Sequence, residues 1–216
     1  MHKRNTLKII MSKNKGNIET KIPMGVLINQ DLLLLIQAVL HVDKCYLSYA
    51  DTNANADDRK DQINQLERVF AYELYHQWSL LKDDYLVLNG EIDKLWNEET
   101  YYPDMVLHGG QDDPVNNKIV VEIKRECMIK GKPKAILDDL EKLSTFLETA
   151  GIDNQLKKYR NYEYAVFLLL KGELNEITNA LKSKNAPNKN LNNNVICMSY
   201  NEQGEIRLAC LADLRK

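Results

Sequence analysis

The chain has 216 residues, of which 44% are hydrophobic and 28% charged, and its formal net charge is −2. This length and composition predict one globular domain and exclude a disordered chain, while the near-neutral charge argues against coating nucleic acid by bulk charge alone. The longest apolar run, residues 32–40, is too short to span a bilayer, and four scattered cysteines fit a reducing compartment. We therefore expect a cytoplasmic protein that does not contact a membrane.

Charge is unevenly distributed along the chain. Residues 1–25 and 118–134 are basic, whereas residues 51–113 are strongly acidic. Acidic and basic segments that share one surface would suit metal-assisted chemistry on phosphate. Solvated charges on helices and loops are the simpler explanation of the same pattern.

The first part of the chain contains an arm followed by two helices. Residues 1–30 are predicted to form an irregular or strand-like arm, because proline and glycine interrupt it. A helix is predicted over about 31–50, with Asn29 or Asp31 as its cap. The next helix is predicted over about 59–82. Its apolar residues recur every three or four positions and mark one buried face: Ile63, Leu66, Phe70, Leu74 and Trp78.

After this helix the apolar pattern changes to the two-residue period of strands. Asn89-Gly90 is a strong signal for a two-residue hairpin turn. The elements expected here are, in order, a strand at Tyr85–Leu88, its hairpin partner at Glu91–Trp96, a strand at Tyr101–Leu107, a turn region at 109–117 and a strand at Lys118–Lys124.

The remaining sequence alternates helices and strands and ends in a hairpin. The elements expected here are helices at 134–149 and 173–184, a buried strand at Tyr164–Leu170, and a hairpin of Val195–Tyr200 with Glu205–Leu211. The whole order predicts a mixed α/β layer fold rather than a regular βαβ winding.

Three charged residues lie on or beside strongly apolar strands. Side chains alternate along a strand, so Glu122 and Lys124 point to one face, about 7 Å apart at their Cα atoms. Asp104 follows Pro103 near the start of the preceding strand, and pairing of the two strands would bring it close to Glu122. Two adjacent carboxylates repel unless a cation lies between them, and Mg²⁺ prefers such oxygen ligands. A nearby lysine can orient a water molecule or neutralise charge on a phosphate.

Pro103-Asp104, seventeen intervening residues and then Glu122-Ile123-Lys124 resemble the motif of the PD-(D/E)XK nuclease superfamily, which has the restriction-endonuclease-like fold. The elements expected over 59–171, a helix, a three-stranded meander, a helix and a strand, are similar in order to the core of that family. The resemblance implies a central mixed β-sheet flanked by helices, to which this chain adds an N-terminal helix and a C-terminal hairpin. It divides the chain into an arm and helix at 1–58, packed on the core, and a nuclease-like domain at 59–216.

The resemblance also implies divalent-metal-dependent cleavage of a phosphodiester bond by a water molecule attacking in line. Asp104 and Glu122 would be metal ligands. Lys124 would position or activate the water, or stabilise the transition state. Glu73, on the first core helix, would complete the metal site directly or through water. Mg²⁺ is the expected cofactor, with Mn²⁺ as its substitute.

Each of these residues also has a purely structural interpretation. Asp104 could be an ordinary strand-entry aspartate, and Glu73 an exposed helix acid. Glu122 and Lys124 could form an ion pair at the edge of a sheet, although their apolar neighbours argue against an edge.

Weaker candidates for contact with substrate or phosphate surround the motif. His76 lies one turn beyond Glu73 on the same helical face, and Arg125 and Lys130 follow the motif closely. A half-buried structural histidine and a solvated basic loop are the corresponding alternatives.

The leading hypothesis is therefore a metal-dependent nuclease that acts on nucleic acid, with DNA favoured over RNA by analogy with the family. A homodimer would suit cleavage of both strands of a duplex. The alternative is a catalytically silent nuclease-fold module that binds nucleic acid or protein through residues 1–25 and the first helix. A weaker third hypothesis is a metal-dependent hydrolase of a small phosphate ester.

Overall fold

The computed structural model describes residues 6–13, 16–23, 28–48, 58–90, 94–96, 99–110, 116–148, 161–184, 186 and 189–216. Its helices are α1 (Gln30–His41), α2 (Cys45–Ser48), α3 (Asp58–Leu81), α4 (Glu126–Ile129), α5 (Pro133–Phe146), α7 (Leu174–Leu181) and α8 (Leu211–Leu214). Its strands are β1 (Thr6–Lys13), β2 (Gly16–Pro23), β3 (Val87–Gly90), β4 (Lys94–Trp96), β5 (Glu99–Tyr101), β6 (Met105–His108), β7 (Asn117–Arg125), β8 (Tyr164–Leu170), β9 (Ile196–Tyr200) and β10 (Ile206–Cys210).

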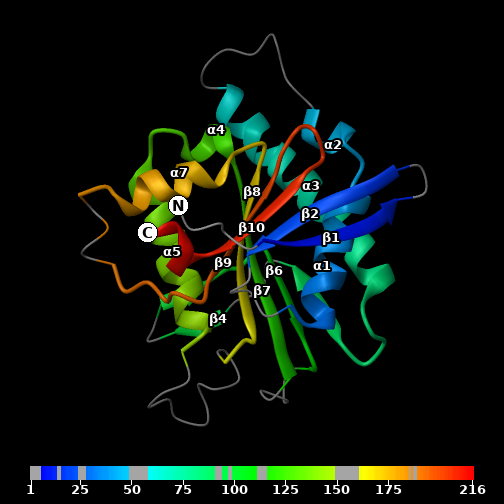
Figure 1. The fold of residues 1–216 in the computed structure, drawn as a ribbon. Helices are drawn as coiled ribbons and strands as arrows, with labels where there is room; N and C mark the ends of the chain where they lie inside the picture. Colours follow the sequence, from blue (N-terminus) through cyan, green and yellow to red (C-terminus); the bar gives the residue numbers. More distant parts are fainter. Residues whose placement is uncertain are drawn as a thin grey trace.

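One mixed sheet organises the fold. Its strand order is β1-β2-β10-β9-β8-β7-β6-β3, while β4 and β5 pair with each other in a second, small sheet. The central strands β7, β8 and β9 run parallel, whereas β3, β6 and β10 each pair antiparallel with a neighbour. The hairpin of β1 and β2 joins the sheet at β10, where Lys21 pairs with Arg207. The predicted mixed α/β fold is confirmed (Figure 1).

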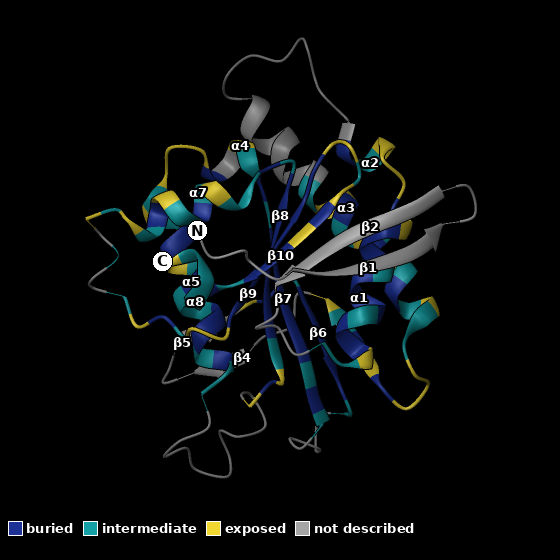
Figure 2. Cartoon of the chain, viewed as in Figure 1, coloured by how far each residue is buried: buried dark blue, intermediate teal, exposed yellow. Residues whose placement is uncertain are grey.

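Helices cover both faces of this sheet (Figure 1). On one face α1 and α3 share an apolar cluster with Ile119, Val121 and Ile123 of β7. On the other face α5 and α7 pack with Val120 of the same strand. Because both faces are covered, the central strands are buried along most of their length, as Figure 2 shows.

Local sequence signals explain how the helices on the first face form. α1 begins after Asn29, whose side chain accepts a hydrogen bond from the amide of Leu32 at 3.0 Å. In α3, Phe70, Leu74 and Trp78 are fully buried at the spacing of one helical face. The predicted cap at Asn29 and the predicted buried face of α3 are confirmed at these residues.

α5, on the second face, is the helix that reaches the candidate site. Pro133 stands in its first turn, where the missing amide hydrogen costs no helical hydrogen bond. Leu137, Leu140 and Leu143 are fully buried against the sheet. The predicted helix over 134–149 is thus confirmed, with its end at Phe146.

The predicted hairpin turn at Asn89-Gly90 is wrong. Both residues belong to β3, where Asn89 pairs with Val106 and Gly90 with Met105 of β6. The predicted partner strand at Glu91–Trp96 is wrong as well, because β4 pairs with β5. The local turn preference is outweighed by a longer-range pairing that buries Leu88 of β3 in the apolar cluster shared with α3.

The predicted helix over 31–50 is interrupted. α1 ends at His41, and a short second helix, α2, starts at Cys45. The side chain of Asp43 accepts a hydrogen bond from the amide of Cys45 at 2.9 Å, which favours a new helix start over continuation. The arm predicted as irregular or strand-like forms β1 and β2.

In the part of the chain that the structure describes, no helix has both the length and the apolar character needed to cross a bilayer. α1 shares its apolar cluster with α3 and β7, so these elements belong to one hydrophobic core. The division of the chain at residue 58 stays a prediction.

Candidate functional site

The candidate site lies where β7 extends past β6. β6 begins at Met105, whereas β7 continues beyond the position that pairs with it. The amide of Ile123 donates to Oδ2 of Asp104 at 2.6 Å, and the amide of Arg125 donates to Oε2 of Glu67 at 3.3 Å. Strand amides without a neighbouring strand need other acceptors. The end of β7 therefore gathers two carboxylates, one from the start of β6 and one from α3.

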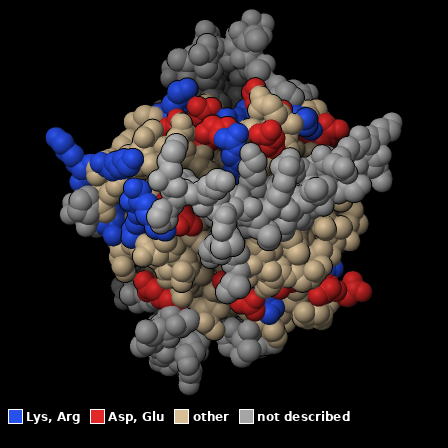
Figure 3. Space-filling view, in the orientation of Figure 1, with Lys and Arg blue, Asp and Glu red and all other residues tan. Residues whose placement is uncertain are grey.

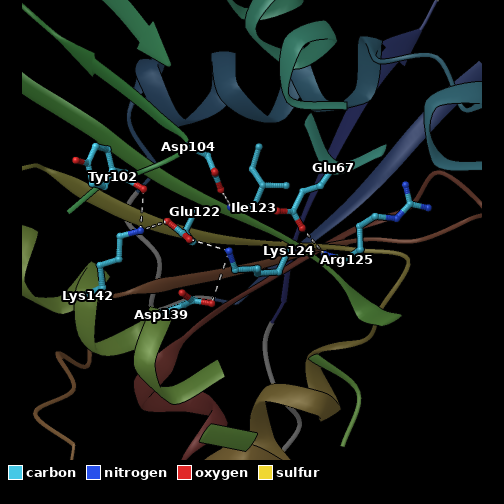
Figure 4. Close-up of polar contacts among 9 residues, drawn as sticks. All are labelled: Glu67, Tyr102, Asp104, Glu122, Ile123, Lys124, Arg125, Asp139 and Lys142. Carbon is cyan, nitrogen blue, oxygen red and sulfur yellow. Dashed lines mark hydrogen bonds and ion pairs between the residues drawn. The ribbon is translucent and has the colours of Figure 1, made fainter. Parts of the chain in front are cut away.

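Glu122 lies at the centre of the site, between two lysines from different elements (Figure 4). Its Oε1 accepts from Nζ of Lys124 at 2.9 Å, and its Oε2 accepts from Nζ of Lys142, on α5, at 2.7 Å. Lys142 also donates to the backbone carbonyl of Tyr102 at 2.9 Å, and Nζ of Lys124 lies 3.9 Å from Oδ2 of Asp139. We refer to the following residues as the Glu122 cluster: Glu67, Asp104, Glu122, Lys124, Asp139 and Lys142.

Asp104 is the acid whose protonation is most affected by this arrangement. Burial and, next, the charge of Glu122 raise the pKa of Asp104 from 3.8 to about 7. The charge of Lys124 and the hydrogen bond from the amide of Ile123 act in the opposite direction. Two carboxylates thus lie close enough to repel each other in a poorly solvated place.

The other members of the cluster respond to the same charges. Burial raises the pKa of Asp139 to about 6, and it also raises the pKa of Glu67, while Lys124 lowers both. Burial lowers the pKa of Lys124, but the carboxylates around it, Glu122 foremost, outweigh burial and bring this pKa above its ordinary value. Lys124 is therefore an ammonium ion at neutral pH.

The cluster has an excess of acid. Four carboxyl groups and two ammonium groups leave two negative charges when all six are ionised. This excess equals the charge of one divalent cation, and carboxylates are the protein ligands that Mg²⁺ prefers. Among the described residues, no group of three or more His, Cys, Asp or Glu side chains is arranged to hold a metal ion. Mg²⁺ often binds through one or two carboxylates with water and a phosphate, so Asp104 and Glu122 are the residues that could hold it here.

Three of the predicted site residues are brought together, namely Asp104, Glu122 and Lys124. Glu73 is not part of this group. Its Oε1 accepts from Nε2 of Gln77 at 2.7 Å, and its charge is the main cause that raises the pKa of Tyr46 in α2. Nearly two turns of α3 thus separate the predicted helix glutamate from the one that reaches β7.

The weaker candidates also lie elsewhere. His76 is exposed on α3, and Lys130 is exposed and forms an ion pair with Glu126 at 3.3 Å. Arg125 is buried, and its Nη2 donates to the carbonyl of Leu47 in α2 at 2.9 Å. Arg125 therefore links α2 to β7, and its predicted contact with substrate stays a prediction.

Sequence reasoning missed Glu67, Asp139 and Lys142. For Glu67 a signal was present, since it stands three residues before Phe70 and seven before Leu74, in line with the buried face of α3. An acid at such a position needs a partner in the interior. Asp139 and Lys142 lie beside the apolar residues of α5, on a helix that resembles the one after the motif in several PD-(D/E)XK nucleases, but the resemblance implies no role for either residue.

Surface charge does not define a substrate-binding face in the view of Figure 3. The described Lys and Arg side chains gather mainly on the side of α7, and Asp and Glu side chains are dispersed among uncharged surface.

Comparison of the chain with models of protein families, with curated proteins and with solved structures gave no match. The interpretation of the Glu122 cluster therefore rests on its own geometry and on the motif that the sequence carries.

Proposed function

We propose that this protein is a divalent-metal-dependent nuclease that hydrolyses phosphodiester bonds in nucleic acid, with DNA as the favoured substrate. The observation that carries the proposal is the meeting of Asp104, Glu122 and Lys124 in one partly buried cluster at the end of β7. These are the residues on which the resemblance to the PD-(D/E)XK superfamily depends.

The order of the elements supports the same proposal. α3 is followed by β3, β6 and β7, then by α5 and β8, and β3, β6, β7 and β8 are neighbours in the sheet. A helix, a meander, a helix and a strand are the parts that the restriction-endonuclease-like fold implies. The restriction-endonuclease-like core is part of this proposal.

The residues of the cluster have separable roles in this proposal. Asp104 and Glu122 would hold Mg²⁺, or Mn²⁺ in its place. When bound, such an ion lowers the pKa of water and offsets negative charge on a phosphate. Lys124, protonated at neutral pH, supports charge that develops on the phosphate rather than accepting a proton. Glu67 fixes the end of β7 through the amide of Arg125 and so positions Lys124.

A second candidate function is favoured by one observation. Both carboxylate oxygens of Glu122 are bonded to lysines, so the cluster is closed by its own ion pairs in this structure. A catalytically silent module that uses the same fold to bind nucleic acid or protein would keep these pairs permanently. This alternative predicts no binding of Mg²⁺ or Mn²⁺ that depends on Glu122.

The experiment that separates the two is calorimetric titration of Mn²⁺ into the wild-type protein and into Glu122→Gln. The same two proteins are then incubated with Mg²⁺ and mixed single- and double-stranded DNA and RNA. The nuclease proposal expects metal binding and cleavage that are both lost in Glu122→Gln. Equal metal binding by the two proteins, or none by either, would favour the silent module.

A further inference from the structure

Lys142 belongs to the Glu122 cluster, but the proposed function assigns it no role. It comes from α5, outside the sequence motif, and its Nζ lies 2.7 Å from Oε2 of Glu122, the carboxylate proposed to hold the metal ion. Glu122 is 3% exposed, so this ion pair is buried on the carboxylate side and is not a solvent-exposed surface pair. A cation could bind that oxygen only after Lys142 leaves it.

The two lysines that bind Glu122 differ in the partners that would remain to them once a cation binds Glu122. Lys124 has a second acid, Asp139, 3.9 Å away, and the charges of Asp104 and Asp139 both raise its pKa. Lys142 also donates to the carbonyl of Tyr102, and its charge lowers the pKa of Asp139, but among the described residues it has no second carboxylate within ion-pair distance. Of the two ammonium groups, Lys142 is therefore the one left without a carboxylate at ion-pair distance when Glu122 binds a cation.

The position of Lys142 also gives it access to an incoming substrate. Its side chain is 16% exposed, and the residue whose carbonyl it contacts, Tyr102, is 54% exposed. Lysine carries a compact charge on a flexible four-carbon stem and can shift without moving its helix. An ammonium released here would lie between the buried carboxylates and solvent, where a phosphodiester would approach.

We propose that Lys142 is a movable phosphate contact: it neutralises Glu122 in the metal-free protein and binds a substrate phosphate once Glu122 has bound the cation. This inference rests on the proposed function. It identifies the ligand of Lys142 as the phosphodiester backbone of nucleic acid, next to Tyr102. It also explains how the negative charge of Glu122 is neutralised before the metal ion binds.

The first test is trace acetylation of lysines with and without Mg²⁺, read by mass spectrometry. Lys142 is expected to react several-fold faster with Mg²⁺ present, because it leaves the carboxylate that shields it. Lys189 is the internal control, since it also pairs with acids of α5, Asp138 and Glu141, and is 20% exposed. Its rate is expected to stay constant.

The second test measures binding of a DNA duplex with hydrolysis-resistant phosphorothioate linkages in Mg²⁺. Lys142→Met is expected to weaken binding about tenfold, as for loss of one hydrogen bond to a charged group. It should also reduce the slope of log K against log salt by about 1, which a merely structural lysine would not do. Lys142→Arg is expected to restore the slope, and Lys189→Met to behave as wild type.

The outcomes separate the inference from the proposed function. Binding of Mg²⁺ that depends on Glu122, with an unchanged reaction rate at Lys142 or an increase at Lys124 instead, overturns the inference and leaves the nuclease proposal in place. An unchanged salt slope in a folded Lys142→Met protein overturns it as well. Absence of Mg²⁺ binding in the wild type overturns both.

Discussion

The amide of Ile123 donates a hydrogen bond to Oδ2 of Asp104 at 2.6 Å, so the strand that carries one catalytic candidate also fixes the other. Asp104 is held by the backbone of β7 and not only by charged neighbours. Substituting side chains around it should therefore change its charge state more readily than its position.

Asp104→Asn is expected to flatten the pH dependence of stability. The folded-state pKa of Asp104 is raised from 3.8 to about 7, so between these values the folded protein holds a proton that the unfolded chain has lost. Stability then falls as pH rises from about 4 to about 7. Asparagine has no such titration and can still accept the amide hydrogen bond of Ile123. Melting temperatures at pH 5 and pH 8 measure the effect.

The exposed Asp84→Asn is the control for this prediction and should keep the pH dependence of the wild type. Identical curves for wild type and Asp104→Asn would show that Asp104 is not the buried acid described here.

Glu67→Gln and Glu73→Gln form a matched pair on one helix. Glu67 contacts the backbone of β7 at Arg125, whereas Glu73 contacts Gln77 on its own helix. Removing the charge at Glu67 is expected to lower cleavage about 10–100-fold, the usual effect of losing a group that positions a metal site. Glu73→Gln should stay close to wild type. Initial rates of cleavage at saturating Mg²⁺ measure both effects. A larger loss of rate in Glu73→Gln than in Glu67→Gln would contradict the assignment of Glu67.

Lys124→Met tests the proposed role of the motif lysine. Its ammonium group stays protonated because Glu122 and the other acids around it favour the charged form. Loss of this charge is expected to lower the cleavage rate about 10²–10³-fold, as for other groups that support transition-state charge. Metal binding by calorimetry should persist. A variant that loses both would indicate that Lys124 instead maintains the shape of the metal site.

Leu140→Ala tests how firmly α5 holds its side of the cluster. Leu140 is fully buried between α5 and the sheet, so its truncation is expected to cost about 2–5 kcal/mol of unfolding free energy. Leu80→Ala, on the exposed side of α3, should cost less than about 0.5 kcal/mol. Urea titration measures both, and similar values for the two would argue against the packing of α5 described here.

The positions of the motif residues could be predicted from sequence because the strand period is robust. Alternation along β7 places Ile119 and Val121 on one face and Glu122 on the other, whatever the neighbouring elements are. The spacing from Asp104 to Glu122 needs only that β6 and β7 pair antiparallel, which they do.

Other sequence signals failed because they were too local. Asn89-Gly90 has the composition of a tight turn, but both residues pair with β6, fifteen or more positions further along the chain. A turn preference is a small energy compared with burying Leu88 in the core.

The sequence by itself determined the mixed α/β fold, the buried face of α3 and the meeting of Asp104 with Glu122 and Lys124, because these depend on short-range periodicity and on one strand pairing. Only the tertiary structure decided which glutamate of α3 reaches the cluster. Glu67 and Glu73 are six residues apart and so point about 120° apart around the helix, and packing fixes which of them faces β7. The tertiary structure also decided that Lys142 would approach Glu122, because the distance between α5 and the sheet depends on the whole core rather than on any segment.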